Sequence, residues 1–125
     1  AIELDLLQAR TLLYTTAEWW TERPQERPAN MWRLAAAKYA VTNAVIRATD
    51  EALRVAGSAG LAATSPLQRY FRDARTAIGQ PPIEDVALTT VGRAALGLGS
   101  IIGNRPLAEG RASPGQATAG IPTRG

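Results

Sequence analysis

The sequence predicts an all-α protein, an up-and-down helical bundle, and three observations lead to this prediction. Apolar residues recur every three or four positions over long stretches, which is the period of an amphipathic helix. No stretch alternates β-branched and polar residues over the length of a strand. Prolines and glycines separate the periodic stretches from one another. We therefore expect one helical domain over residues 1–99, with helices at about 2–22, 29–57, 66–78 and 83–98.

The first two predicted helices are long, and a proline-rich turn separates them. The first has one apolar stripe at steps of three and four: Ile2, Leu6, Ala9, Leu13, Ala17 and Trp20. A second apolar row lies beside this stripe: Leu4, Leu12 and Trp19. Aromatic residues dominate core and interface area, so Trp19 and Trp20 are interpreted as packing residues. The second helix begins after Pro28 with Asn30 as its predicted cap, and its alanines at steps of four favour close packing of another helix.

The last two predicted helices each have a recognisable start. Ser65 followed by Pro66 has the capping and first-turn chemistry that opens the third helix. The stretch 79–82 interrupts the chain with two prolines, which cannot donate to a helical ladder. Glu84 and Asp85 then fall in the first turn of the fourth helix, where the helix dipole favours negative charge.

Composition excludes several classes of site. The chain has 125 residues and neither cysteine nor histidine, so disulfides, zinc-finger spacings and Cys or His nucleophiles cannot operate within it, and no metal site is predicted. The longest uncharged run, residues 55–68, is too short and too rich in glycine for a bilayer span. Residues 1–99 carry eleven cations and ten anions, which leaves little electrostatic footprint for nucleic acid. Residues 100–125 are rich in glycine and proline and are predicted to form a flexible tail.

Four features occur in a fixed order along the chain. They are Lys38 in an alanine-rich helix, the turn 53–60 (LRVAGSAG), the run 66–75 (PLQRYFRDAR) and a closing helix that ends at 92–97 (GRAALG). In this order the chain resembles the C-terminal helical domain of the acyl-CoA dehydrogenase superfamily, over roughly residues 6–97. Members of that family are longer, so the resemblance implies the last part of such a protein and an incomplete four-helix bundle.

The resemblance implies a function as well as a fold. Members of the family are flavoprotein oxidoreductases of fatty acid metabolism that bind FAD and an acyl-CoA thioester. We expect a cytoplasmic location. They remove the α proton with a carboxylate and pass the β hydride to the flavin. The resemblance also implies a homo-oligomer, a dimer or a tetramer, in which the helical domain of one subunit helps complete the flavin site of its neighbour. The isolated segment is not expected to be active.

The FAD-binding residues implied by the resemblance lie at the end of the second helix. Arg54 stands where the family has a glutamine, and Gly57, Ser58 and Gly60 occupy the position of its glycine-rich turn. An arginine can pair with a diphosphate bidentately, and a turn of small residues exposes backbone N–H groups to phosphate oxygens. The alternative is a helix that simply ends on glycine beside an exposed arginine.

The catalytic base is not assigned. Gln80 falls near the position of the family's glutamate, and an amide cannot usefully accept a proton. Glu84 and Asp85 are close enough to be candidates if the correspondence slips. Three explanations stay open: a base on a preceding helix, a non-catalytic subunit of a hetero-oligomer, or membership of the flavin-dependent monooxygenase branch. The alternative to the whole interpretation is a stand-alone helical interaction module.

Overall fold

The structure, a computed structural model, describes residues 1–101. Its four α-helices are α1 (Ile2–Glu22), α2 (Met31–Ala56), α3 (Pro66–Thr76) and α4 (Glu84–Ala95). Short 3-10 helices connect them: η1 (Pro24–Glu26), η2 (Pro28–Asn30), η3 (Gly57–Leu61) and η4 (Ala77–Gly79). Residues 1–101 contain no strand, which confirms the predicted all-α fold class.

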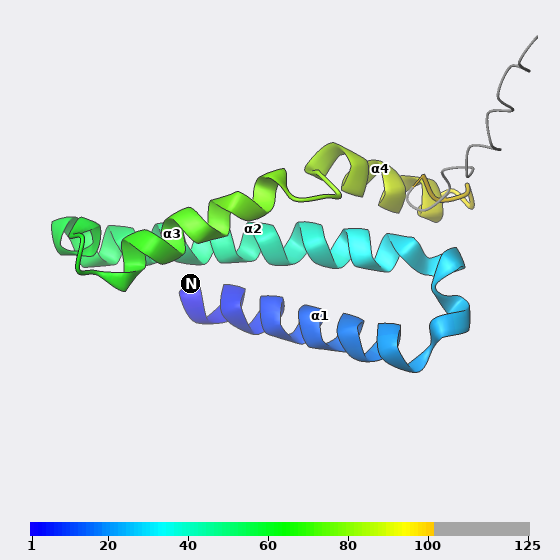
Figure 1. The fold of residues 1–125 in the computed structure, drawn as a ribbon, viewed down its shortest axis with the longest axis horizontal. Coiled ribbons are helices and arrows are strands. Elements are labelled where there is room, and N and C mark those ends of the chain that lie inside the picture. Colours follow the sequence, from blue (N-terminus) through cyan, green and yellow to red (C-terminus); the bar gives the residue numbers. More distant parts are fainter. Residues whose placement is uncertain (102–125) are drawn as a thin grey trace, which may run out of the picture.

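The central rod of the molecule is α2, and the other helices pack along its two sides (Figure 1). On one side, α1 runs antiparallel to α2. On the other side, α3 and α4 follow one another end to end and together make a third rod (Figure 1). The three rods run alternately up and down, as the prediction of an up-and-down bundle requires. Because α2 packs against all three other helices, it holds the domain together.

The face that α1 turns toward α2 differs from the predicted apolar stripe. Its partly or fully buried residues are Ile2, Asp5, Ala9, Leu12, Thr16, Trp19 and Trp20, and the first six recur at steps of three and four. On α2, the small residues Ala44 and Ala48 are buried and allow the two helices to approach closely. Leu6, Leu13 and Ala17 belong to the predicted stripe but are exposed. They remain exposed because a helix with several apolar sides buries only those that face a neighbour, and α1 packs mainly against α2.

Two predicted helix caps have different outcomes. The Leu67 N–H donates to the Ser65 hydroxyl oxygen at 3.3 Å, and Pro66 occupies the first helical position, which confirms the predicted start of α3. Asn30 precedes α2, but its side chain makes no capping bond to that helix. Its amide instead donates to the Glu26 carbonyl oxygen at 3.0 Å. Asn30 is therefore at the N-cap position, as predicted, but without a side-chain capping bond, because η1 and η2 place a carbonyl acceptor within reach of the amide.

Helix α4 is shorter than its apolar pattern indicates. The pattern predicts a helix to residue 98, whereas α4 ends at Ala95. Gly97 adopts a φ of +69°, and the Leu98 N–H donates back to the Arg93 carbonyl oxygen at 2.8 Å. A glycine with positive φ is a common way to end a helix, so the last apolar residue of the pattern lies beyond the helix rather than on it.

Ion pairs between side chains connect α1 and α3 to α2. Asp5 on α1 binds Arg47 on α2, with 2.7 Å between Oδ1 and Nη2. Asp50 on α2 binds Arg75 on α3, with 2.6 Å between the same two atom types. The Arg75 guanidinium also lies over the Phe71 ring, 3.4 Å from its centroid. These contacts hold α1 and α3 in register along the central helix.

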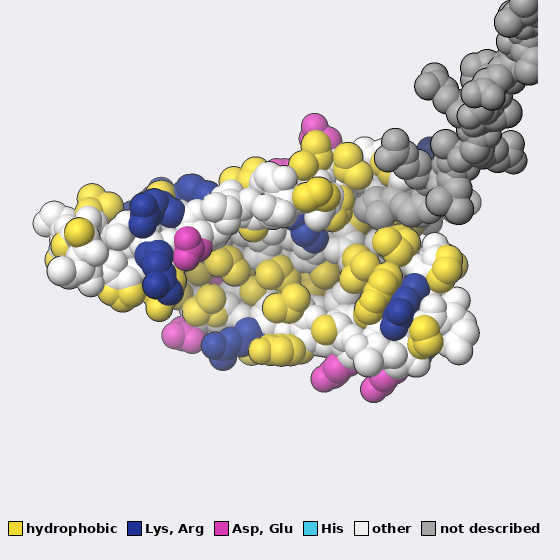
Figure 2. All heavy atoms as spheres, viewed as in Figure 1, with side chains coloured by type: hydrophobic (Ala, Val, Ile, Leu, Met, Phe, Trp, Pro, Cys, Tyr) yellow, Lys and Arg dark blue, Asp and Glu magenta, His cyan; other side chains and the backbone are white. Residues whose placement is uncertain are grey.

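Apolar side chains remain exposed along α1. The large ones are Leu4, Leu6, Leu7, Leu13 and Tyr14, which are between 37% and 64% exposed. Figure 2 shows hydrophobic side chains at the surface along the line where α1 and α2 meet. A groove of about 500 Å³ runs between these helices and is lined largely by apolar residues, among them Leu13, Ala17, Leu34 and Val41. An apolar surface of this kind is typical of a face that another structural element covers.

Two further predictions concern membranes and the chain end. None of the helices within residues 1–101 combines the length and the hydropathy needed to cross a bilayer. The predicted tail, residues 100–125, lies outside the described residues from position 102 onward.

Candidate functional site

The predicted cofactor-binding residues lie at the end of α2, where the chain turns into η3. Gly57 ends the helix with φ +60° and ψ −148°, a combination that residues other than glycine rarely adopt. Its N–H donates to the Leu53 carbonyl oxygen and closes the last turn of α2. Arg54 lies within that last turn, where the helix dipole favours a cation. The turn is therefore a regular helix end, and glycine occupies the one position of it that has a positive φ.

Gly60 has a packing role. It is buried, and a Cβ built on it would lie 2.9 Å from the Ala56 Cβ and 3.1 Å from a Leu53 methyl group. A side chain at this position would push η3 away from α2. The close approach of η3 to α2 explains this glycine without any ligand.

Arg54 and Ser58 are the accessible polar side chains of this turn. Both are exposed, and a Cβ built on Gly57 would meet nothing within 4 Å, so the backbone between them is open to solvent. Within residues 1–101 the Arg54 guanidinium makes neither an ion pair nor a hydrogen bond. A guanidinium and a hydroxyl suit the oxygens of a phosphate, whereas the Gly57 N–H already donates to the Leu53 carbonyl oxygen. The residues present therefore fit the diphosphate of a nucleotide cofactor.

The candidate bases lie in the connection between α3 and α4. Gln80 follows η4 and is exposed, and its N–H donates to the Ala77 carbonyl oxygen at 3.3 Å. The peptide bond between Pro81 and Pro82 is cis. Glu84 and Asp85 are exposed in the first turn of α4, so the helix dipole gives both a structural explanation.

The structure does not bring the two predicted sets together. Glu84 lines a cavity of about 50 Å³ with Thr42 and Lys38 of α2. Arg54 lies twelve residues beyond Thr42 on the same helix, which is about 18 Å at the helical rise of 1.5 Å per residue. The turn and the connection are therefore separate surfaces of this chain.

Lys38 occupies a position between two hollows. It lines the cavity next to Glu84 and also the groove between α1 and α2. It is half-buried and has no ion-pair partner within the described part of the chain. Because its side chain lines both hollows, its alkyl stem is interpreted as a packing group.

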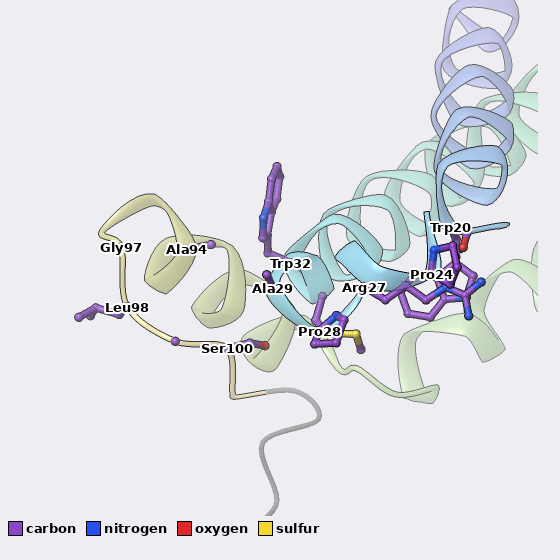
Figure 3. A pocket seen from close by; sticks show the side chains of 12 residues that line it. Trp20, Pro24, Arg27, Pro28, Ala29, Trp32, Ala94, Gly97, Leu98 and Ser100 are labelled. Atoms are coloured by element: carbon purple, nitrogen blue, oxygen red, sulfur yellow. Dashed lines mark hydrogen bonds between the residues drawn. The ribbon is translucent and has the colours of Figure 1, made fainter. Parts of the chain in front are cut away.

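A further hollow lies at the opposite end of α2, where α1, η1 and η2 meet the end of α4. It measures about 810 Å³. Figure 3 shows Trp20, Pro24 and Arg27 on one side of it and Ala94, Gly97 and Ser100 on the other. The sequence interpretation assigned Trp19 and Trp20 to packing and did not find this hollow. The signal available was the pair of Arg-Pro dipeptides at 23–24 and 27–28 between tryptophans.

Two comparisons with known proteins bear on the identity of this fold. The family model described as the acyl-CoA dehydrogenase C-terminal domain matches residues 1–79. The chain belongs to this family. It is also 41% identical over 87 residues to YdbM of Bacillus subtilis (strain 168), a protein assigned by name to the acyl-CoA dehydrogenases. That alignment covers 70% of this chain and 23% of YdbM, so the chain spans under a quarter of its relative.

The acyl-CoA dehydrogenase family match covers one predicted site and not the other. It includes α1, α2, η3 and α3, and with them the turn at Arg54, Gly57, Ser58 and Gly60. It ends at residue 79, immediately before Gln80, Glu84 and Asp85. The correspondence of Gln80 with the family's glutamate therefore rests on the sequence pattern alone.

Residues 1–101 hold no group of three or more His, Cys, Asp or Glu that could bind a metal ion.

Proposed function

We propose that this chain is the C-terminal helical domain of an FAD-dependent flavoprotein that oxidises acyl-CoA thioesters by α,β-dehydrogenation. Membership of the acyl-CoA dehydrogenase C-terminal family supports this proposal. The structural observation that carries it is the open turn after α2, with an unpaired Arg54 and a solvent-facing backbone at Gly57 and Ser58. Within the whole protein we expect this turn to contact the FAD diphosphate.

Each residue of the turn has a distinct part in this proposal. The Arg54 guanidinium supplies two parallel N–H donors to phosphate oxygens, and the Ser58 hydroxyl supplies a third. Gly57 keeps the backbone free of a side chain, and Gly60 holds η3 against α2. FAD, when bound, would accept the β hydride of the acyl chain.

The proton acceptor is not among the residues best placed to hold the cofactor. Gln80 is exposed but carries an amide, which is a poor base. Glu84 and Asp85 are exposed carboxylates, and Glu84 lies beside Thr42, which is about 18 Å from Arg54 along α2. We propose that they serve the start of α4 and that the base is contributed from elsewhere in the protein. A flavin-dependent monooxygenase would use the same turn and would need no such base.

The exposed apolar side of α1 supports a partner for this domain. We propose that the protein is a cytoplasmic homo-oligomer, a dimer or a tetramer, in which this turn completes the flavin site of a neighbouring subunit. The second candidate function is a helical interaction module or a non-catalytic subunit. The same apolar groove between α1 and α2 favours it.

One measurement separates these functions. The native polypeptide is captured from its source cells with an antibody against residues 2–22, and its mass and visible spectrum are recorded. We expect a polypeptide several times heavier than 13.3 kDa with flavin absorption bands. A colourless polypeptide of 13.3 kDa would exclude the flavoenzyme and leave the interaction module.

A further inference from the structure

Arg27 is held in a single place at the rim of the large hollow. Its Nε donates to the Trp20 carbonyl oxygen at 2.7 Å, and its guanidinium lies over the Trp20 ring, 4.8 Å from the centroid. Pro24 and Pro28 start the two 3-10 turns on either side of it, and their fixed φ angles limit the motion of this corner. The arginine is therefore positioned before any ligand arrives, which lowers the entropic cost of binding.

The terminal nitrogens of Arg27 have no partner among residues 1–101. The one hydrogen bond of its side chain uses Nε, and no carboxylate of the described chain lies within ion-pair distance. Arg23, four residues earlier and also followed by proline, differs because it pairs with Glu26 at 3.5 Å. The two terminal nitrogens of Arg27 thus keep the N–H donors that bind a carboxylate or phosphate bidentately.

The walls of the hollow are mainly apolar and carry no negative charge. Arg27 is the one charged side chain that lines it within residues 1–101, and no Asp or Glu contributes. The apolar walls include Trp20, Met31, Trp32 and the two prolines (Figure 3). Its volume of about 810 Å³ falls within the usual range for small-molecule sites, about 300 to 1,000 Å³.

We propose that this hollow binds a small molecule in which a carboxylate or phosphate is attached to an apolar or aromatic body. The Arg27 terminal nitrogens bind the anionic group, and the indole, proline and methionine surfaces cover the apolar body. This site lies at the opposite end of α2 from the Arg54 turn and does not rest on the function proposed for that turn.

The test uses the intact protein and isothermal titration calorimetry with three probes of similar size. Phenyl phosphate and phenylacetate carry the two anionic groups, and benzyl alcohol is the neutral control. We expect saturable binding of at least one anion and much weaker binding of the alcohol. The anion that binds more tightly identifies the headgroup class. Equal binding of all three probes, or of none, would overturn the proposal.

Arg27→Gln and Arg23→Gln form a matched pair for this test. Both remove one guanidinium next to a proline, but only Arg27 lines the hollow. Loss of a charge-assisted pair should weaken anion binding about tenfold or more in Arg27→Gln. Binding by Arg23→Gln should stay within about twofold, since its screened surface pair contributes little. Equal losses in both variants would show that only overall charge matters.

A second pair of variants keeps the test valid if Arg27→Gln is poorly folded. Ala29 is exposed in η2 and lines the hollow, so its substitution disturbs no buried contact. Ala29→Glu brings a carboxylate that competes for Arg27 and repels the anion, whereas Ala29→Gln has nearly the same size without charge. We expect the glutamate variant to bind the anionic probe about tenfold more weakly than the glutamine variant. Identical affinities would contradict the site.

Discussion

The two ends of α2 are built in opposite ways. At the η3 end, the chain turns because side chains are missing: Gly57 takes a backbone conformation that other residues rarely adopt, and Gly60 lets η3 lie against Ala56 and Leu53. At the other end, large side chains make the corner. Arg27 stacks on Trp20 there, and Arg33 lies over both Trp19 and Trp32 at 4.9 and 5.2 Å.

The difference determines where each end of α2 presents polar groups that have no partner in the described chain. Close packing at η3 leaves Gly57, Ser58 and Arg54 on an open surface. Rings and guanidinium groups cannot pack as closely as glycines, so the corner encloses a hollow. The first end is defined by local backbone constraints and the second by contacts between distant parts of the chain.

The largest stability loss is expected from Gly60→Val. The added side chain meets Ala56 and Leu53 where even a Cβ is too close, so we expect a loss of about 2 to 3 kcal/mol in the free energy of unfolding. Urea denaturation followed by circular dichroism measures it. Gly79→Val is the control, because nothing lies within 4 Å of a Cβ at that position. Similar losses in both variants would mean that η3 does not pack as closely as described.

Gly57→Ala separates backbone strain from steric contact. No atom lies within 4 Å of the added Cβ, so the expected loss of about 1 to 2 kcal/mol arises from the positive φ alone. Gly57→Asn should cost as much, because ψ −148° is far from the left-handed helical region that asparagine tolerates. Gly92→Ala in α4 should have the opposite sign and stabilise by up to about 1 kcal/mol. A neutral Gly57→Ala in the same urea assay would argue against the strained turn.

Asp50→Asn tests the tie between α2 and α3 near the η3 end. It weakens the 2.6 Å pair with Arg75, both partners of which are about one-third exposed, and we expect a loss of about 1 kcal/mol. The control is Asp73→Asn, since Asp73 pairs with Arg69 at 3.7 Å and both are about two-thirds exposed. That change should cost at most about 0.5 kcal/mol. Thermal unfolding of the two variants side by side compares them, and a larger loss in Asp73→Asn would reverse the assignment.

The smallest stability change is expected from Arg54→Gln, which should stay within about 0.5 kcal/mol because the side chain is exposed and unpaired within the described chain. In the whole protein, however, its affinity for FAD should fall about tenfold. Flavin release on dilution, followed by fluorescence, measures this. Arg72→Gln removes an exposed arginine of α3 and should leave flavin affinity nearly unchanged. Unaltered flavin binding in Arg54→Gln would remove this residue from the cofactor site.

Much of the fold could be predicted from local patterns. The steps of three and four predicted four helices in their observed order, and Ser65 with Pro66 predicted the start of α3. The resemblance to the acyl-CoA dehydrogenase C-terminal domain came from the same residues and is confirmed by the family match. The roles of Arg54, Gln80, Glu84 and Asp85 stay predictions.

The sequence by itself determined helix content and helix order, because periodicity and proline breaks act over a few neighbouring residues, and its four ordered motifs indicated the family by resemblance. Only the tertiary structure decided which side of α1 is buried, since Leu6, Leu13 and Ala17 are as apolar as the residues that face α2. It also decided that Glu84 and Arg54 lie on separate surfaces and that Arg27, Trp20 and Ala94 surround one hollow. Those outcomes depend on which helices pack against one another, and the free energy of that packing comes from contacts between residues far apart in the chain.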